Sequence, residues 1–122
     1  MAKSRADELL STIRTAQLEL NDIQAAHRDK VNAALLGKCF RYRNSFSGDN
    51  HWWLYVKVIG AEDGYVVVHK FERRGNGEFL LDPHHTMYGR SISDDGSYKP
   101  IDNELFQDEW NAFVSEIEGM LP

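Results

Sequence analysis

Apolar residues in the first third of the chain recur at helical spacing. Between Ser4 and Leu36 there is no proline or glycine, and residues that favour helix dominate. The pattern predicts one long helix that Ser4 caps and that Gly37 ends. Its apolar residues follow one another at intervals of 4, 3, 4 and 3, the heptad spacing of a coiled coil. The seam residues are Leu9, Ile13, Ala16, Leu20 and Ile23.

The length of this helix bears on its role. From residue 4 to residue 36 it extends roughly 50 Å, which exceeds the diameter of a domain this small. Its first half therefore needs a partner, and self-association through the seam is our first interpretation. The second is that the helix folds back on its own domain or is broken near Asn21 and Asp22. Just over two heptads are marginal for an isolated coiled coil, so further contacts or further chains have to contribute.

From Lys38 to Ile92 the pattern changes to short strands separated by turn signals. The separators SGDN, AEDG, RGNG and SDDG combine glycine with Asp or Asn, which favour turns. The predicted strands cover residues 38–43, 52–59, 65–72, 78–82 and 87–92. Five such strands predict a small antiparallel, barrel-like sheet with the shape of a Src-homology-three barrel, which by itself implies no function.

Residues 101–122 carry the pattern of an amphipathic helix. Asp102 is expected to cap it, with Ile101 and Phe106 as a hydrophobic staple. Apolar side chains line one face and acidic ones the other, so the helix should cover an apolar surface and expose acid. The apolar stripe is Phe106, Trp110, Phe113, Val114 and Ile117.

Together these elements predict an α+β protein. Residues 1–37 form the long N-terminal helix, with oligomerisation as its expected role. Residues 38–122 form the barrel-like domain with its closing, acidic C-terminal helix.

Two adjacent tryptophans in NHWWLYVKV, residues 50–58, point to opposite faces of the predicted strand because side chains alternate along a strand. One face is wholly apolar and should be the core face; the other is mixed and should be the outer face. The core set is Trp52, Leu54, Val56 and Val58. The outer set begins with Trp53, Tyr55 and Lys57.

Alternation in KCFRYR also turns two arginines outward. Consecutive strands are usually neighbours, so these arginines can share the outer face with the second tryptophan, a composition typical of a binding hot spot. The candidate partner-binding residues are Arg41, Arg43, Trp53, Tyr55 and Lys57. A competing interpretation is that the C-terminal helix covers this face and sets its acids beside the arginines. The sequence leaves both interpretations open.

Composition narrows the class of protein. The 122 residues are 42% hydrophobic and 27% charged, as in ordinary globular proteins, and no segment approaches the roughly 20 apolar residues of a membrane span. The beginning, MAKSRADELLSTIR, is too charged for a signal peptide, so a cytoplasmic location is expected. Cys39 is the single cysteine, which excludes an internal disulfide. The net charge is -5, and the excess of acid lies in residues 101–122.

Catalytic chemistry is not indicated by the motifs. The two histidines of DPHH, residues 82–85, diverge on extended backbone and lack further ligands at zinc spacing. No pattern places a histidine beside Cys39, and RRGNGEF lacks the helix and lysine of a phosphate-binding loop. We therefore expect a protein that is not an enzyme and that uses no metal or cofactor.

Nucleic-acid binding is the alternative function. Exposed aromatic residues and arginines of a small barrel can stack bases, and Arg73 and Arg74 at a predicted hairpin tip can reach a phosphate. The acidic C-terminal segment weighs against it, because nucleic-acid binders concentrate positive charge.

The segment GKCFRYRNSFSGDNHWWLYVKVIG, between a short coiled coil and an acidic helix, resembles small proteins encoded by bacteriophages and prophages. The resemblance rests on the FRYRNS and WWLYxKV elements, about 25 residues of the chain. It implies a phage accessory protein that binds and inhibits a bacterial protein, such as a component of a CRISPR defence complex or a replication complex. The expected partners are a second copy of the chain and this bacterial protein.

Overall fold

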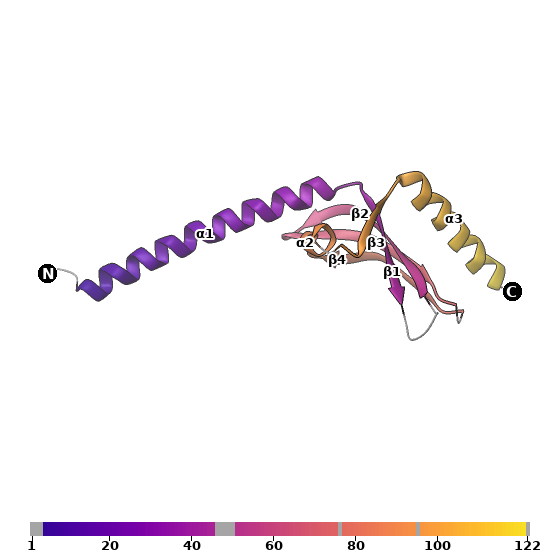
Figure 1. The fold of residues 1–122 in the computed structure, drawn as a ribbon, viewed down its shortest axis with the longest axis horizontal. Coiled ribbons are helices and arrows are strands. Elements are labelled where there is room, and N and C mark those ends of the chain that lie inside the picture. Colours follow the sequence, from indigo (N-terminus) through magenta and orange to yellow (C-terminus); the bar gives the residue numbers. More distant parts are fainter. Residues whose placement is uncertain (1–3, 46–50, 76, 95, 122) are drawn as a thin grey trace.

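The computed structural model describes residues 4–45, 51–75, 77–94 and 96–121. It is an α+β fold in which helices pack on both faces of one antiparallel sheet (Figure 1). The elements in chain order are α1 (Arg5–Leu35), β1 (Cys39–Ser45), β2 (His51–Glu62), β3 (Tyr65–Arg73), β4 (Phe79–Met87), α2 (Gly89–Ser93), β5 (Tyr98–Ile101) and α3 (Asn103–Met120). The predicted class, the long first helix and the last helix are confirmed.

The five-stranded sheet is open. Its strand order is β4-β3-β2-β1-β5, with every neighbouring pair antiparallel. The predicted closure into a barrel is wrong, because β4 and β5 stand at opposite edges instead of pairing. Pro83 lies in β4 and Pro100 in β5, and a proline has no N–H for a further strand. The likeness to a Src-homology-three barrel stays a prediction.

The predicted strand at residues 87–92 is also wrong. Met87 ends β4, and the next residues form the short helix α2, whose Ile92 is buried in the core. The fifth strand is β5, whose residues the turn and strand pattern of the sequence does not predict as a strand. A single helical turn can bury one apolar residue, here Ile92, as well as a short strand can. The pattern of six residues therefore does not distinguish a helical turn from a strand.

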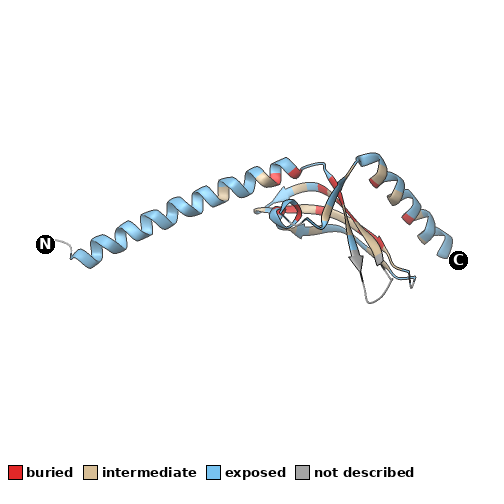
Figure 2. Ribbon diagram, in the orientation of Figure 1, coloured by how far each residue is buried: buried red, intermediate tan, exposed pale blue. Residues whose placement is uncertain are grey.

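Helix α1 is continuous and points away from the sheet (Figure 1). Ser4 caps it by accepting a hydrogen bond from the amide of Asp7 at 3.2 Å, and Gly37 follows with the positive φ of 77° that ends such helices. Its buried residues are Asn32 and Leu35, both near its end (Figure 2). The interpretation that the helix folds back or breaks near Asn21 and Asp22 is therefore wrong.

Two clusters of buried side chains lie on the two faces of the sheet. On the face covered by α2 and the end of α1, which we call the α2 face, the cluster is mostly aliphatic, with Phe40 as its one buried aromatic residue among the described ones. We call it the aliphatic cluster, and it centres on Val56, Val58, Val66 and Val68. On the opposite face, which we call the α3 face, the cluster contains Cys39, Tyr55, Phe71, Phe106 and Phe113. Both layers belong to residues 38–121 except for the last turns of α1, whose Val31 and Leu35 join the first cluster.

Helix α3 begins as predicted. The Asp102 carboxylate accepts a hydrogen bond from the amide of Leu105 at 2.8 Å. Phe106 and Phe113 are buried against the sheet, and Trp110 and Ile117 pack beside them. The apolar stripe therefore lies on the α3 face, and most of the acidic residues face outward.

Candidate interaction surfaces

The five candidate partner-binding residues lie together on the α3 face. In the β1–β2 pairing, Arg41 is opposite Tyr55 and Arg43 is opposite Trp53. Residues that face each other in an antiparallel pair project to the same side of the sheet. Lys57 follows on the same face of β2, opposite Cys39. The structure therefore brings the predicted set together.

Helix α3 covers part of this set. Tyr55 is only 8% exposed and stacks on Phe71 with ring centroids 5.1 Å apart. Trp53 is half-buried and packs against the same aromatic cluster. Arg43 is exposed. The covering interpretation thus holds for Tyr55, whereas Trp53 and Arg43 stay within reach of a partner.

An arginine and a tryptophan are in contact on this face. The guanidinium carbon of Arg41 lies 4.4 Å from the ring centroid of Trp53, within cation–π range. Lys99 of β5 is opposite Arg41 and exposed. The uncovered rim of the α3 face therefore presents cations around a half-buried indole. We call this rim, formed by Arg41, Arg43, Trp53 and Lys99, the basic rim.

The acids of α3 pair with a different arginine from those that the sequence suggested. Arg73 of β3 lies 2.9 Å from Glu116 and 3.4 Å from Glu109. These pairs join α3 to the β3 side of the sheet, opposite to the basic rim. Burial raises the pKa of the Tyr55 hydroxyl, and the nearby Glu109 carboxylate raises it further.

Trp52 lies on the α2 face with Leu54, as predicted, but it is half-buried and stands outside the aliphatic cluster. Its indole N–H donates to the carboxylate of Glu72 at 2.8 Å, and the guanidinium of Arg74 lies 5.3 Å from its ring centroid. Glu72 is 2% exposed and also accepts from Arg74 at 2.8 Å. The α2 face therefore becomes polar where β2 begins and β3 ends.

Sequence reasoning missed this buried carboxylate. A signal was present, because the core-facing alternation of Val66 and Val68 continues to Lys70 and Glu72. A tryptophan paired with such a strand end needs an acceptor for its N–H. Recognising that acceptor required the pairing of β2 with β3.

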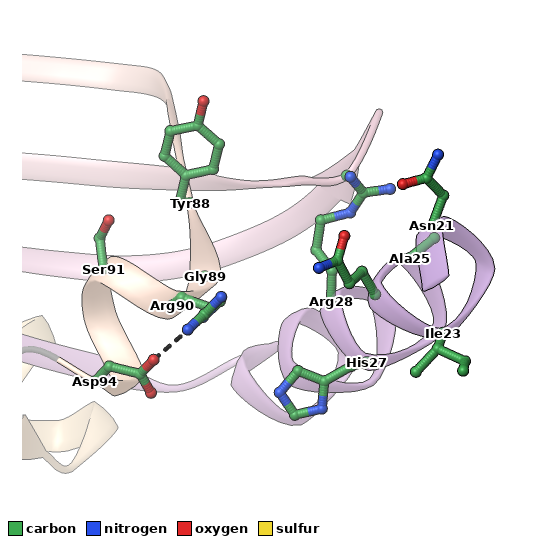
Figure 3. Close-up of a pocket in the computed structure, with 12 residues that line it drawn as sticks. Asn21, Ile23, Ala25, His27, Arg28, Tyr88, Gly89, Arg90, Ser91 and Asp94 are labelled. Carbon is green, nitrogen blue, oxygen red and sulfur yellow. Dashed lines mark hydrogen bonds and ion pairs between the residues drawn. The ribbon is translucent and has the colours of Figure 1, made fainter. Parts of the chain in front are cut away.

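A groove of about 1160 Å³ lies where α1 leaves the domain (Figure 3). Its helical wall contains Ile23, His27 and Arg28, and the opposite wall is α2, where Arg90 is paired with Asp94 at 3.3 Å. The complete lining is Asn21, Ile23, Gln24, Ala25, His27, Arg28, Gly64, Tyr88, Gly89, Arg90, Ser91 and Asp94. The sequence did not indicate this groove, because its two walls lie far apart along the chain.

Two glycines let α1 approach the sheet at the base of the groove. A methyl group at Gly89 would collide with the Oδ1 atom of Asn32, and one at Gly64 would lie 2.7 Å from Arg28. Asn32 is 3% exposed and donates to the carbonyl of Gly64 at 3.0 Å. The root of α1 is therefore held closely, in contrast to its free first half.

The seam of α1 is exposed along its whole predicted length. Its four large side chains, Leu9, Ile13, Leu20 and Ile23, are between 47% and 66% exposed. Soluble proteins seldom expose a continuous apolar row of this length without a partner for it. The predicted seam residues are thus accessible to another chain.

Histidine and cysteine chemistry gains no support from the geometry. Among the described residues no group of three or more metal-ligating side chains comes together. His85 pairs with Asp82 at 3.1 Å. Burial raises the pKa of the Cys39 thiol, whose sulfur lies 3.0 Å from the side-chain oxygen of Asn103, and a raised pKa opposes thiolate formation.

Comparison with known proteins identifies no relative: no family model, no curated protein and no solved structure matches this chain. In the described part of the chain we also find no helix with the length and apolar character of a membrane span.

Proposed function

We propose that this chain is a self-associating, protein-binding module without enzymatic activity, in which α1 joins copies and the sheet domain carries the partner surface. The observation that carries the proposal is the exposed seam from Leu9 to Ile23 on a continuous helix. A heptad row without charged residues is complementary to another helix of the same period. A second copy of this chain carries a helix with the same heptad row.

Light scattering tests the self-association. We expect the wild type to have at least twice the mass of one 14.0 kDa chain, and the double variant Ile13→Asp, Leu20→Asp to be monomeric. Leu18→Asp is the matched control, because Leu18 is 66% exposed but lies on the opposite side of α1 from the seam. A monomeric wild type would refute this part of the proposal.

The basic rim is the partner surface that we propose, and an acidic surface of a bacterial protein is its proposed occupant. Arg41 lies over the half-buried indole of Trp53 there, Arg43 is opposite this tryptophan, and Lys99 is opposite Arg41. Interface hot spots favour Trp and Arg. Opposite charge on the partner would speed association and select it against other proteins. The likeness to phage accessory proteins supports a defence or replication complex as the target.

A plating assay tests this role. The chain is expressed in bacteria that restrict a phage through an active defence system, and the efficiency of plating of that phage is measured. We expect the wild type to raise plating and the variant Arg43→Glu, Trp53→Ala to lose the effect. Leu81→Ala is the control, because Leu81 is exposed on β4, away from the basic rim. Equal activity of both variants would refute the assignment of the surface.

Nucleic-acid binding is the competing proposal, and the structure gives its hairpin arginines other contacts. Arg74 pairs with Glu72 and Glu78, and Arg73 pairs with Glu109 and Glu116. Each cation is thereby largely neutralised. Retention of labelled single-stranded DNA at low salt, falling steeply as salt rises, would favour the competing proposal over ours.

A further inference from the structure

The seam of α1 has the same spacing when it is read backwards. Ala6 precedes Leu9 by three residues and is also exposed, so the apolar seam has six positions at intervals of 3, 4, 3, 4 and 3. Two copies can therefore align all six positions either in parallel or in antiparallel orientation. The two orientations differ in which seam residues of the two helices face each other.

Antiparallel alignment places a large residue against every small one. Ala6 then faces Ile23 of the other copy, Ala16 faces Ile13, and Leu9 faces Leu20. Parallel alignment stacks each residue on its own copy, so that alanine meets alanine and isoleucine meets isoleucine. Even filling of successive layers is what close packing requires, and it favours the antiparallel pair.

The polar continuation of the seam points the same way. The next seam positions are His27 and Lys30, which in a parallel pair would face their own copies and repel when charged. In the antiparallel register they extend past Arg5, where the partner helix begins.

The groove beside α2 lies where the partner helix would begin. In the antiparallel register the first turns of the partner run beside residues 21–24, which include part of the helical wall of the groove. The groove therefore offers a contact surface in addition to the two heptads of the seam, which are marginal alone.

We infer that two copies pair through α1 in antiparallel orientation, with each helix start at the groove of the other copy. This inference rests on the proposed self-association. The two sheet domains then stand at opposite ends of a rod, with their α1 roots about 60 Å apart at 1.5 Å per residue. Such a pair presents two basic rims separately and does not merge them into one surface.

Cysteine crosslinking tests the orientation. Cys39 is buried, so the wild-type chain serves as the blank. Leu9→Cys and Leu20→Cys chains carrying different tags are oxidised separately and as a mixture. We expect the mixture to form at least about tenfold more disulfide than either variant alone, because only facing β-carbons come within about 4 Å. Leu18→Cys is the control for collision, since it is exposed on the outer side of α1.

The outcomes distinguish failure of the orientation alone from failure of self-association through the seam. Rapid crosslinking of Leu20→Cys with itself means a parallel pair, which overturns this inference and keeps the self-association. A monomer in light scattering overturns both. An oligomer in which neither the mixture nor the single variants crosslink above Leu18→Cys associates through another surface and also overturns both.

Spin labels at the root of the helix give an independent distance. With a label on Leu36→Cys, at an exposed position just after α1, the antiparallel pair should show a separation of roughly 65 Å. A parallel pair should show about 10 to 20 Å, since packed helices lie 8–10 Å apart. The shorter distance would overturn the inference without any reliance on disulfide geometry.

Discussion

Helices α1 and α3 both carry an apolar stripe, but their own chain covers only that of α3. The stripe of α3 buries Phe106 and Phe113 on the sheet, whereas Leu9, Ile13, Leu20 and Ile23 of α1 are about half exposed or more. The two stripes also differ in kind. That of α3 is broad and aromatic, and that of α1 is a narrow aliphatic row at heptad spacing.

The connections explain the difference. A single residue, Asp102, separates α3 from β5, so the helix starts at the edge of the sheet and its stripe crosses the α3 face. Helix α1 meets the sheet only at its end, where Val31 and Leu35 pack into the aliphatic cluster. Its seam lies one to four heptads before that contact. An amphipathic pattern therefore predicts that the apolar stripe of a helix is buried. Where the helix connects to the sheet decides whether its own domain or another chain covers that stripe.

The largest difference between the two helices should appear when one apolar residue of each stripe is truncated to alanine. Phe113→Ala removes a fully buried ring and should lower the free energy of unfolding by about 3 to 5 kcal/mol at every protein concentration. Leu20→Ala should change the unfolding of a single chain by less than about 0.5 kcal/mol, because the side chain is exposed within it. Denaturant titrations at two protein concentrations measure both, and equal effects would contradict the comparison.

A substitution at the root of α1 should destabilise the domain, as a substitution in the buried stripe of α3 does and one in the exposed seam does not. Gly89→Ala forces a methyl group against Asn32 and should destabilise the domain by roughly 1 to 3 kcal/mol. Gly96→Ala is the matched control, since no atom lies within 4 Å of its added methyl group. Thermal unfolding measures the pair of variants. A silent Gly89→Ala would mean that α1 is not held at its root as described.

Acid should loosen the α3 interface but not the seam. The ring of His69 lies 4.7 Å from that of Trp110, and its buried Nε2 atom has no hydrogen-bond partner among the described residues. Burial lowers the pKa of His69 below its ordinary value of about 6.5, and the nearby Lys57 and His84 lower it further. The unfolded chain therefore binds more protons than the folded one as the pH falls below about 6.5.

Stability should accordingly fall below that pH, by at most about 1.4 kcal/mol per pH unit from this one group, until the folded-state pKa is reached. The variant His69→Phe should remove this part of the slope, as measured by denaturant unfolding between pH 5 and pH 8. A wild-type slope in His69→Phe would show that other groups govern the acid response.

The smallest expected effect concerns the charges that join α3 to β3. Arg73→Ala removes contacts with Glu109 and Glu116, and because the arginine side chain is 38% exposed the loss should be only about 0.5 to 1 kcal/mol. The loss should shrink in concentrated salt. Arg14→Ala on exposed α1 should stay within about 0.5 kcal/mol. Unfolding at low and high ionic strength tests both variants.

Much of the candidate surface was predictable because it follows from alternation along single strands. Arg41, Trp53 and Tyr55 share a face as expected, and the cation–π contact between Arg41 and Trp53 follows from their diagonal positions on neighbouring strands. The choice between cover and partner was not predictable. It depends on where α3 crosses the sheet, and α3 buries Tyr55 while leaving Trp53 half-buried.

The sequence by itself determined the extent of α1, its heptad seam, the cap of α3 and the division of Trp52 from Trp53, because each follows from the spacing of neighbouring residues. Only the tertiary structure decided that the sheet stays open, that Glu72 is buried under Trp52, and that Gly64 and Gly89 receive the root of α1. These features join residues that are far apart along the chain. Their free energies depend on which surfaces meet, and periodicity along one segment does not specify that.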